Sequence, residues 1–146
     1  MITTTYSRKI AAAHKNGPPD GKCYNMHGHT WEIEVNVTMP SDRLDIDTGW
    51  GIDFHILKDI IDFYDHTTLN LFTYDEEWSD GKYDGLFTSE MHNKRNHCDS
   101  KQILTWPSAE GLAMGIYLQI KAVVPYAAIE VTVFEGDHES VTYDGN

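Results

Sequence analysis

The sequence predicts a single α+β domain, residues 1–146, in which an antiparallel sheet is covered on one face by two helices. Its length suits one hydrophobic core. Two segments alternate apolar and polar residues at period two, and two helical patterns lie between them. One-sided alternation is typical of antiparallel sheets, and helices that follow one another between strands disfavour a parallel βαβ fold.

The two predicted strands are residues 30–39 and 129–135. In the first, every second residue from Trp31 to Met39 is apolar. In the second, one face carries the apolar residues Ile129, Val131 and Val133. Each segment therefore presents one face to a core and the other face to water.

The two predicted helices each follow a candidate N-cap residue. The first follows Asp53 and the second follows Ser108, and Pro125 stops the second. Apolar residues recur at helical spacing in both: Phe54, Leu57, Ile60, Ile61 and Tyr64 in the first, and Leu112, Ile116, Ile120 and Val123 in the second.

Residues 73–106 form an atypically long inserted excursion between the two helices. A connection of this length in a compact domain is usually functional or mobile. Within it, His92, His97 and Cys98 either form a second metal site or, more simply, belong to a solvated loop.

Composition and charge restrict the function. No apolar run approaches the roughly 20 residues that cross a bilayer, and residues 1–8 lack the features of a secretory signal. The 2 cysteines suit a reducing compartment, so we expect a soluble, cytoplasmic protein with no membrane partner. The net charge of −12 argues against nucleic-acid binding, although the basic N-terminal residues 1–22 could attract a small anion.

The segment Cys23-Tyr-Asn-Met-His27-Gly-His29 leads directly into the first predicted strand. Residues two apart on a strand point the same way, so His27 and His29 share a face with Trp31. Two imidazoles at the end of an apolar face either bind a divalent cation or merely form hydrogen bonds. His14, which follows three alanines, is available as a third nitrogen ligand. Three histidines with an open position are the arrangement of a catalytic zinc, but the spacing alone leaves both alternatives open.

Two further residues have chemical and ordinary interpretations. Cys23 is a candidate base, because a thiolate reacts where a thiol does not; otherwise it is a small buried hydrophobe. Glu135 continues the face of Val133, where the period calls for another apolar residue. Its carboxylate therefore either meets hydrogen-bond donors or lies at a strand end that reaches water.

Six motifs, taken in order, resemble the family of 6-pyruvoyl- and 6-carboxytetrahydropterin synthases over nearly the whole chain. They are Ala-Ala-His14, Lys22-Cys23-x-x-x-His27-Gly-His29, Gly49-Trp-Gly-Ile-Asp53-Phe, Asp65-His66-x-x-Leu69-Asn70, Pro107-Ser108-x-Glu110-x-Leu-Ala113 and Phe134-Glu135. The resemblance implies a tunnelling fold, in which subunits assemble into a β-barrel, usually as a hexamer with active sites at subunit interfaces. It also implies that His14, His27 and His29 bind Zn²⁺.

The resemblance assigns roles to the remaining site residues. Cys23 is implied as the base, and Asp65 and His66 as a proton relay that reaches the active site from a neighbouring subunit. Glu135 is implied to bind two adjacent N–H groups of a pterin ring. Substrate binding is also expected of Ser108 and of Glu110, although an acid in the first turn of a helix is favoured whatever the function.

The three-residue spacer between Cys23 and His27 resembles that of the 6-carboxytetrahydropterin synthases. This implies conversion of 7,8-dihydroneopterin triphosphate to 6-carboxy-5,6,7,8-tetrahydropterin, with release of acetaldehyde and triphosphate, in 7-deazaguanine (queuosine-type) biosynthesis. Two alternatives remain: a 6-pyruvoyl-tetrahydropterin synthase, which eliminates triphosphate and keeps the side-chain carbons, and a zinc-stabilised pterin-binding protein without turnover.

Overall fold

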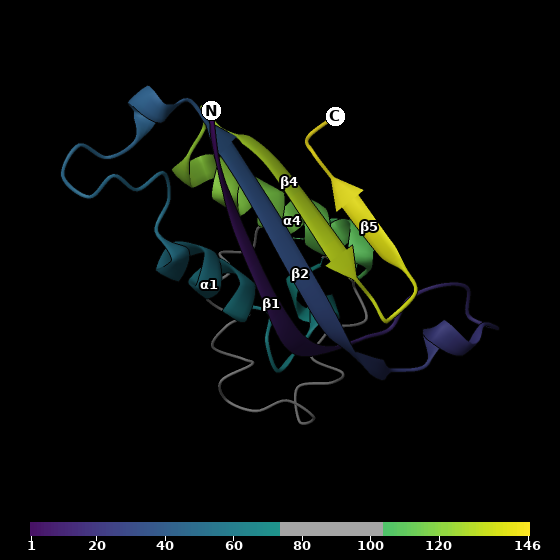
Figure 1. Cartoon of the computed structure of the whole chain (residues 1–146). Helices are drawn as coiled ribbons and strands as arrows, with labels where there is room; N and C mark the ends of the chain where they lie inside the picture. The colour runs from purple at the N-terminus through teal and green to yellow at the C-terminus, as the bar shows by residue number, and fades with distance from the viewer. Residues whose placement is uncertain (74–103) are drawn as a thin grey trace.

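The computed structural model describes residues 1–73 and 104–146, which form a five-stranded sheet with the strand order β3-β1-β2-β4-β5 (Figure 1). The long strands β1 (Ile2–His14) and β2 (His27–Met39) pair antiparallel over their whole length. β4 (Ala128–Phe134) pairs with β2, and β5 (Ser140–Tyr143) pairs with β4, both antiparallel. The short β3 (Thr67–Thr68) lies parallel to the end of β1.

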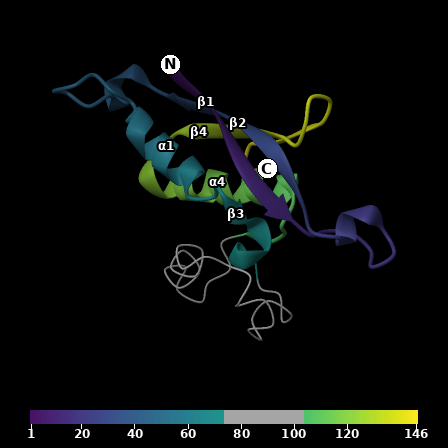
Figure 2. The same cartoon turned by 90° about the horizontal axis from the view of Figure 1, so that it is seen from below.

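Two α-helices, α1 (Phe54–Asp62) and α4 (Ala109–Val123), lie on the same side of the sheet (Figure 2). Each begins at the predicted cap: Asp53 accepts a hydrogen bond from the N–H of His55, and Ser108 accepts one from the N–H of Gly111. Three short 3₁₀ helices complete the described elements: η1 (Lys22–Tyr24), η2 (Ser41–Arg43) and η3 (Leu69–Phe72). No helix in the described ranges is long and apolar enough to cross a membrane.

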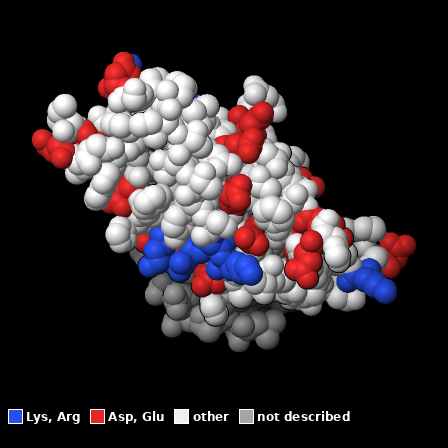
Figure 3. Space-filling view, in the orientation of Figure 1, with Lys and Arg blue, Asp and Glu red and all other residues white. Residues whose placement is uncertain are grey.

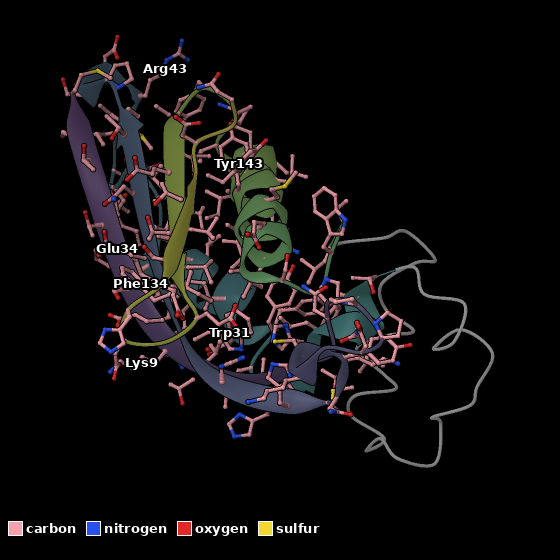
Figure 4. All side chains as sticks on the ribbon, turned by 90° about the vertical axis from the view of Figure 1, so that its right-hand side faces the viewer. Lys9, Trp31, Glu34, Arg43, Phe134 and Tyr143 are labelled. Carbon is pink, nitrogen blue, oxygen red and sulfur yellow. The ribbon has the colours of Figure 1, made fainter. Side chains whose placement is uncertain are left out.

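The core lies between the sheet and the helices. Trp31, Ile33 and Val35 of β2 are fully buried on the helix side, as the alternation predicted. In the edge-on view of the sheet, Trp31 lies near the end of β2 where the strand begins (Figure 4). The buried side chains of β2 pack with the inward face of α4, whose buried residues include Leu112 and Ile116.

The other face of the sheet is polar, and no helix of residues 1–73 or 104–146 covers it. Cross-strand side chains on it are hydrogen-bonded, for example Thr3 with Thr38 at 2.8 Å and Thr132 with Thr142 at 2.8 Å. In the orientation of Figure 3, acidic side chains are dispersed over the surface, whereas lysines and arginines gather mainly in one group. On this face the basic side chains are therefore less evenly spread than the acidic ones.

Most of the predicted architecture is confirmed, with three corrections. The sheet is mixed rather than purely antiparallel, because the chain leaving α1 returns alongside β1 in the same direction; the N–H of His66 donates to the carbonyl of Ala11 and two residues then pair. The first predicted strand begins earlier, at His27, and the second ends at Phe134, before Glu135. Most of the predicted 73–106 excursion, including His92, His97 and Cys98, lies outside the described residues.

Candidate metal centre and pocket

The structure brings His14, His27 and His29 together at one end of the sheet. His14 is the last residue of β1 and pairs with His27, the first residue of β2, while His29 lies one step further along the same face. One nitrogen from each of the three rings lies within 4.8 Å of the other two. Regular strand geometry therefore converges three imidazoles from two neighbouring strands on one point.

Main-chain carbonyls orient two of these rings. The Nδ1 of His14 is 2.6 Å from the carbonyl oxygen of Pro107, and the Nδ1 of His27 is 2.7 Å from that of Asn25. A carbonyl only accepts, so each Nδ1 carries the hydrogen and each Nε2 keeps its lone pair. Metal-binding histidines are commonly held in this way by a carbonyl behind the ring.

The hydrogen bonding of the three histidines also fits a metal ion. The Nε2 atoms of His14 and His29 are buried and have no hydrogen-bond partner. A buried polar atom without a partner is costly, and a divalent cation would satisfy both atoms at once. Three imidazole nitrogens are a typical ligand set for zinc that keeps one position open.

The electrostatics favour the neutral imidazole that metal binding requires. Burial lowers the pKa of His14, and the neighbouring His27 and His29 act in the same direction, against the opposing effects of Pro107 and Glu135. Glu135 also approaches His29, with its Oε1 3.2 Å from Nε2 but not in hydrogen-bond geometry. The carboxylate therefore lies at the boundary between the histidines and the pocket described below.

The ring of Trp31 packs against two of the histidines, His14 and His29. It is fully buried, and its indole N–H donates a 3.0 Å hydrogen bond to the carbonyl of Ala12. Its ring meets those of His14 and His29 edge-on, with centroids 5.1 Å and 5.2 Å apart. The strand pattern predicted Trp31 as a core residue on the same face as His29, but it did not predict the contact with His14.

Gly111 also supports the site and was missed by the sequence analysis. A Cβ atom at this position would lie 1.9 Å from the carbonyl oxygen of Trp106, so only glycine allows segment 106–107 to lie against the first turn of α4. That segment supplies the Pro107 carbonyl that holds His14. A glycine in the first turn of a helix, where it is unfavourable, was the available signal.

Cys23 lies in η1, on the connection between the two strands that carry the histidines, and it is exposed. Its carbonyl accepts a 2.8 Å hydrogen bond from the N–H of Asn16, which closes this connection at its base. The thiol is thus open to a small molecule, and the buried-hydrophobe interpretation of Cys23 is wrong.

Asp65 and His66 follow α1 at the edge of the sheet. Oδ1 of Asp65 accepts from the N–H of Ala11 at 2.9 Å, and Oδ2 lies 2.9 Å from Nδ1 of His66. Burial works to raise the pKa of Asp65, but the hydrogen bonds from Ala11 and His66 outweigh it, so the pKa lies below its ordinary value. The side chain of His66 is 82% exposed and lines an open hollow of about 440 Å³ together with His29.

The predicted substrate residues lie near the N-terminus of α4. Glu110 and Glu135 line one hollow of about 300 Å³, which Glu139 also lines. Ser108 is buried, and its hydroxyl accepts from the N–H of Gly111 at 3.2 Å. Two of the three predicted substrate residues therefore lie in one pocket, and the third caps a helix.

Two known proteins are similar in sequence to part of this chain. A 6-carboxy-5,6,7,8-tetrahydropterin synthase of Bacillus subtilis is 45% identical over 51 residues, which are 34% of this chain and 33% of that protein. A probable 6-carboxy-5,6,7,8-tetrahydropterin synthase of Halobacterium salinarum is 34% identical over 61 residues, 42% of this chain and 38% of that protein. The aligned segments thus span only about a third of these two relatives.

Solved structures share the fold. The 6-pyruvoyl tetrahydropterin synthase of Caenorhabditis elegans superposes with a TM-score of 0.62 at 20% identity, covering 99% of this chain and 96% of that one. The uncharacterized protein WS1659 of Wolinella succinogenes gives a TM-score of 0.58 at 14% identity, covering 99% and 98%. The family model described as 6-pyruvoyl tetrahydropterin synthase matches residues 3–146. The chain belongs to the 6-pyruvoyl tetrahydropterin synthase family.

Proposed function

We propose that this protein converts 7,8-dihydroneopterin triphosphate and one molecule of water to 6-carboxy-5,6,7,8-tetrahydropterin, releasing acetaldehyde and triphosphate, in 7-deazaguanine (queuosine-type) biosynthesis in the cytoplasm. The observation that carries the proposal is the group of three histidines with two buried, unpartnered nitrogens beside a pocket lined by Glu135. The three-residue spacer from Cys23 to His27 and the names of the two partially aligned relatives support the 6-carboxy reaction.

The site provides a place for the ion. His14, His27 and His29 would hold Zn²⁺ through the nitrogens that face one another, and zinc supplies Lewis-acid polarisation of bound hydroxyl groups. The protein's contribution is to hold these rings in place: the Pro107 and Asn25 carbonyls contact two rings through Nδ1, and Trp31 packs against two.

Proton transfer falls to Cys23, Asp65 and His66. The exposed thiol of Cys23 can reach a substrate and, as a thiolate, take a carbon-bound proton from its side chain. Asp65 holds the His66 ring through Nδ1, which leaves the opposite nitrogen to donate or accept a proton. The high exposure of His66 suits a role in the site of a neighbouring subunit.

We expect a homo-oligomer, a hexamer in which the sheets of the subunits close into a barrel. β3 covers β1 only at Ala12 and Ala13, so the edge of β1 from Ile2 to Ala11 carries no other strand of the described chain. Long open strand edges pair readily with other strands, and barrel closure removes them. The same assembly would carry the Asp65 and His66 pair to a neighbouring subunit.

Glu135 is the proposed anchor of the pterin ring. A carboxylate matches two adjacent N–H donors in a bidentate pair. Glu135 lies between the histidines and the pocket, so a pterin ring bound to Glu135 would direct the side chain of the pterin toward the histidines. Glu110 lines the same pocket, and the hydroxyl of Ser108 lies at its helix terminus, so both are proposed as secondary contacts.

The decisive experiment is product analysis with zinc-loaded protein and 7,8-dihydroneopterin triphosphate. We expect acetaldehyde, triphosphate and the carboxylated pterin in equal amounts. Triphosphate without acetaldehyde would identify a 6-pyruvoyl-tetrahydropterin synthase, and tight binding without any product would identify a pterin-binding protein.

The His27→Ala variant tests the metal centre in the same preparation. Losing a residue that only supports a metal ligand typically lowers metal affinity by about 10-fold to 100-fold. His27→Ala removes a ligand itself, so we expect its zinc affinity to fall by more than about 100-fold. The matched control is His55→Ala, since His55 is exposed on α1 and should leave the zinc content unchanged. Full zinc occupancy in His27→Ala would contradict the proposed metal centre.

A further inference from the structure

We infer that Asn70 is a positioning residue that holds His14 and Cys23 in their relative places, an inference that rests on the proposed function. Asn70 closes the motif Asp65-His66-x-x-Leu69-Asn70 but has no role assigned by the resemblance. Its side chain is buried, with 3% of the residue exposed, and it points at the main chain directly after His14.

The amide of Asn70 contacts a single residue twice. Its Oδ1 accepts from the N–H of Lys15 at 3.0 Å, and its Nδ2 donates to the carbonyl of Lys15 at 3.0 Å. β3 pairs in parallel with β1 only as far as Thr68 and Ala13. In a parallel ladder, a neighbouring strand would bond both the N–H and the carbonyl of one residue. The Asn70 side chain therefore takes the place of a strand that has ended, and it extends the support of β1 past His14.

The same support continues to Cys23. Lys15 is followed by Asn16, whose N–H donates to the carbonyl of Cys23 at 2.8 Å. The side-chain ammonium of Lys15 also lies 4.2 Å from the centre of the Tyr24 ring, next to Cys23. The Asn70 amide thus holds Lys15, which directly follows the candidate metal ligand His14. Through the next residue, Asn16, it is also linked to the candidate base Cys23.

A purely structural role for Asn70 predicts a different set of effects. If the amide only satisfied buried main-chain groups, its loss would lower the free energy of unfolding and nothing else. If it positions the site, its loss should also change metal affinity and the reactivity of the thiol. Zinc binding without substrate and thiol alkylation without metal measure these two effects separately.

The variants are Asn70→Asp and Asn70→Ala, made with Cys98→Ser so that Cys23 is the remaining cysteine of the 2. Asn70→Asp has the same shape and still accepts from Lys15 N–H, but it loses the donor to the Lys15 carbonyl. Asn36→Asp makes the same chemical change on the polar face of the sheet, where Asn36 accepts from Thr5. Val37→Ala destabilises the core at the far end of β2, where Val37 pairs with Thr4 and Ile129.

We expect zinc affinity, measured by competition with a chelator, to fall about 10-fold to 100-fold in both Asn70 variants. The alkylation rate of Cys23 by iodoacetamide should differ from that of the parent, and both controls should match the parent in both measurements. With substrate, kcat should fall while KM holds, because the base moves and the pterin anchor does not.

Asn70→Asp carries the test if Asn70→Ala does not fold. Folded Asn70 variants with parental zinc affinity and a parental alkylation rate would overturn the inference. These readouts need no pterin, so failure of the parent to release acetaldehyde would count against the proposed reaction and not against Asn70.

Discussion

Two parts of β2 follow one uninterrupted register with opposite contents. From Trp31 to Met39, the helix-facing positions are apolar and buried, whereas at His27 and His29 the same face carries imidazoles. The backbone does not change where the chemistry begins. What changes is the surroundings: the apolar part packs with the inward face of α4, whereas the histidine end lies beside His14 of β1, which contacts the Pro107 carbonyl in the segment before α4.

The difference teaches that the candidate metal centre is an extension of the core rather than an addition on a loop. The sheet gives the histidines rigid positions without special backbone geometry. It follows that changes in the apolar part should affect stability and leave the metal in place, whereas changes at the other end should affect function and leave the fold in place. The predictions below test that separation.

The largest effect is expected for Cys23→Ala. Turnover should fall about 10²-fold to 10⁴-fold, the contribution of a general base, with zinc and pterin still bound. Steady-state kinetics and metal analysis measure the two properties together. The matched control is Cys98→Ala, which should turn over like the parent. Undiminished turnover in Cys23→Ala would remove Cys23 from the reaction.

Next in size is the effect of Ile33→Ala, in the apolar part of β2. Ile33 is fully buried, so the free energy of unfolding should fall by about 2–5 kcal/mol. Chemical denaturation of the metal-free protein measures it. Zinc stoichiometry of the folded variant should equal that of the parent.

The control for Ile33→Ala is Glu34→Ala, one residue along on the opposite face, which should change the unfolding free energy by no more than about 0.5 kcal/mol. If folded Ile33→Ala bound zinc much more weakly than the parent, the two parts of β2 would not be separable.

Glu135→Gln should affect ligand binding. The exchange replaces an acceptor with a donor opposite a pterin N–H, which costs on the order of 2–4 kcal/mol. Pterin affinity should therefore fall roughly 30-fold to several hundred-fold, whatever side chain the pterin carries. Calorimetric titration with simple pterins measures it, with Glu139→Gln from the same pocket as the control. Parental affinity in Glu135→Gln would direct the search for the anchor to Glu110.

The smallest effect is expected for Ser108→Ala, at the N-cap of α4. Loss of the cap on α4 should lower the unfolding free energy by about 1 kcal/mol. Ser108→Thr keeps the hydroxyl and should restore stability. A loss of pterin affinity in Ser108→Ala that Ser108→Thr also restores would assign the hydroxyl to both roles, and an unchanged affinity would leave it as a cap alone.

The sequence predicted the elements whose patterns are strong and local. β2 and the starts of both helices follow from strict alternation and from the caps at Asp53 and Ser108. Most of β1 was not predicted, because Thr3, Thr4 and Thr5 precede any clear alternation and the strand is defined by its partner β2. β3 has only two residues, and its parallel pairing depends on where α1 returns the chain.

The candidate site was predicted as far as its side chains. The positions of His14, His27 and His29 follow from strand parity and the family motifs, and the structure gathers them. Their supports could not be predicted, because a carbonyl such as that of Pro107 has no sequence signature. Asn70 and Gly111 act through contacts with residues distant in sequence or in an adjoining turn, which no periodic pattern encodes.

The backbone of His66 has a consequence for any attempt to improve this protein. Its φ of 56° is left-handed, a conformation that costs a residue with a Cβ roughly 1–2 kcal/mol and that glycine adopts freely. A glycine there would relieve that cost and delete the imidazole in a single substitution. Directed evolution for thermal tolerance alone would therefore enrich His66→Gly, and a library screened in that way would accumulate robust proteins that have lost the proposed proton relay.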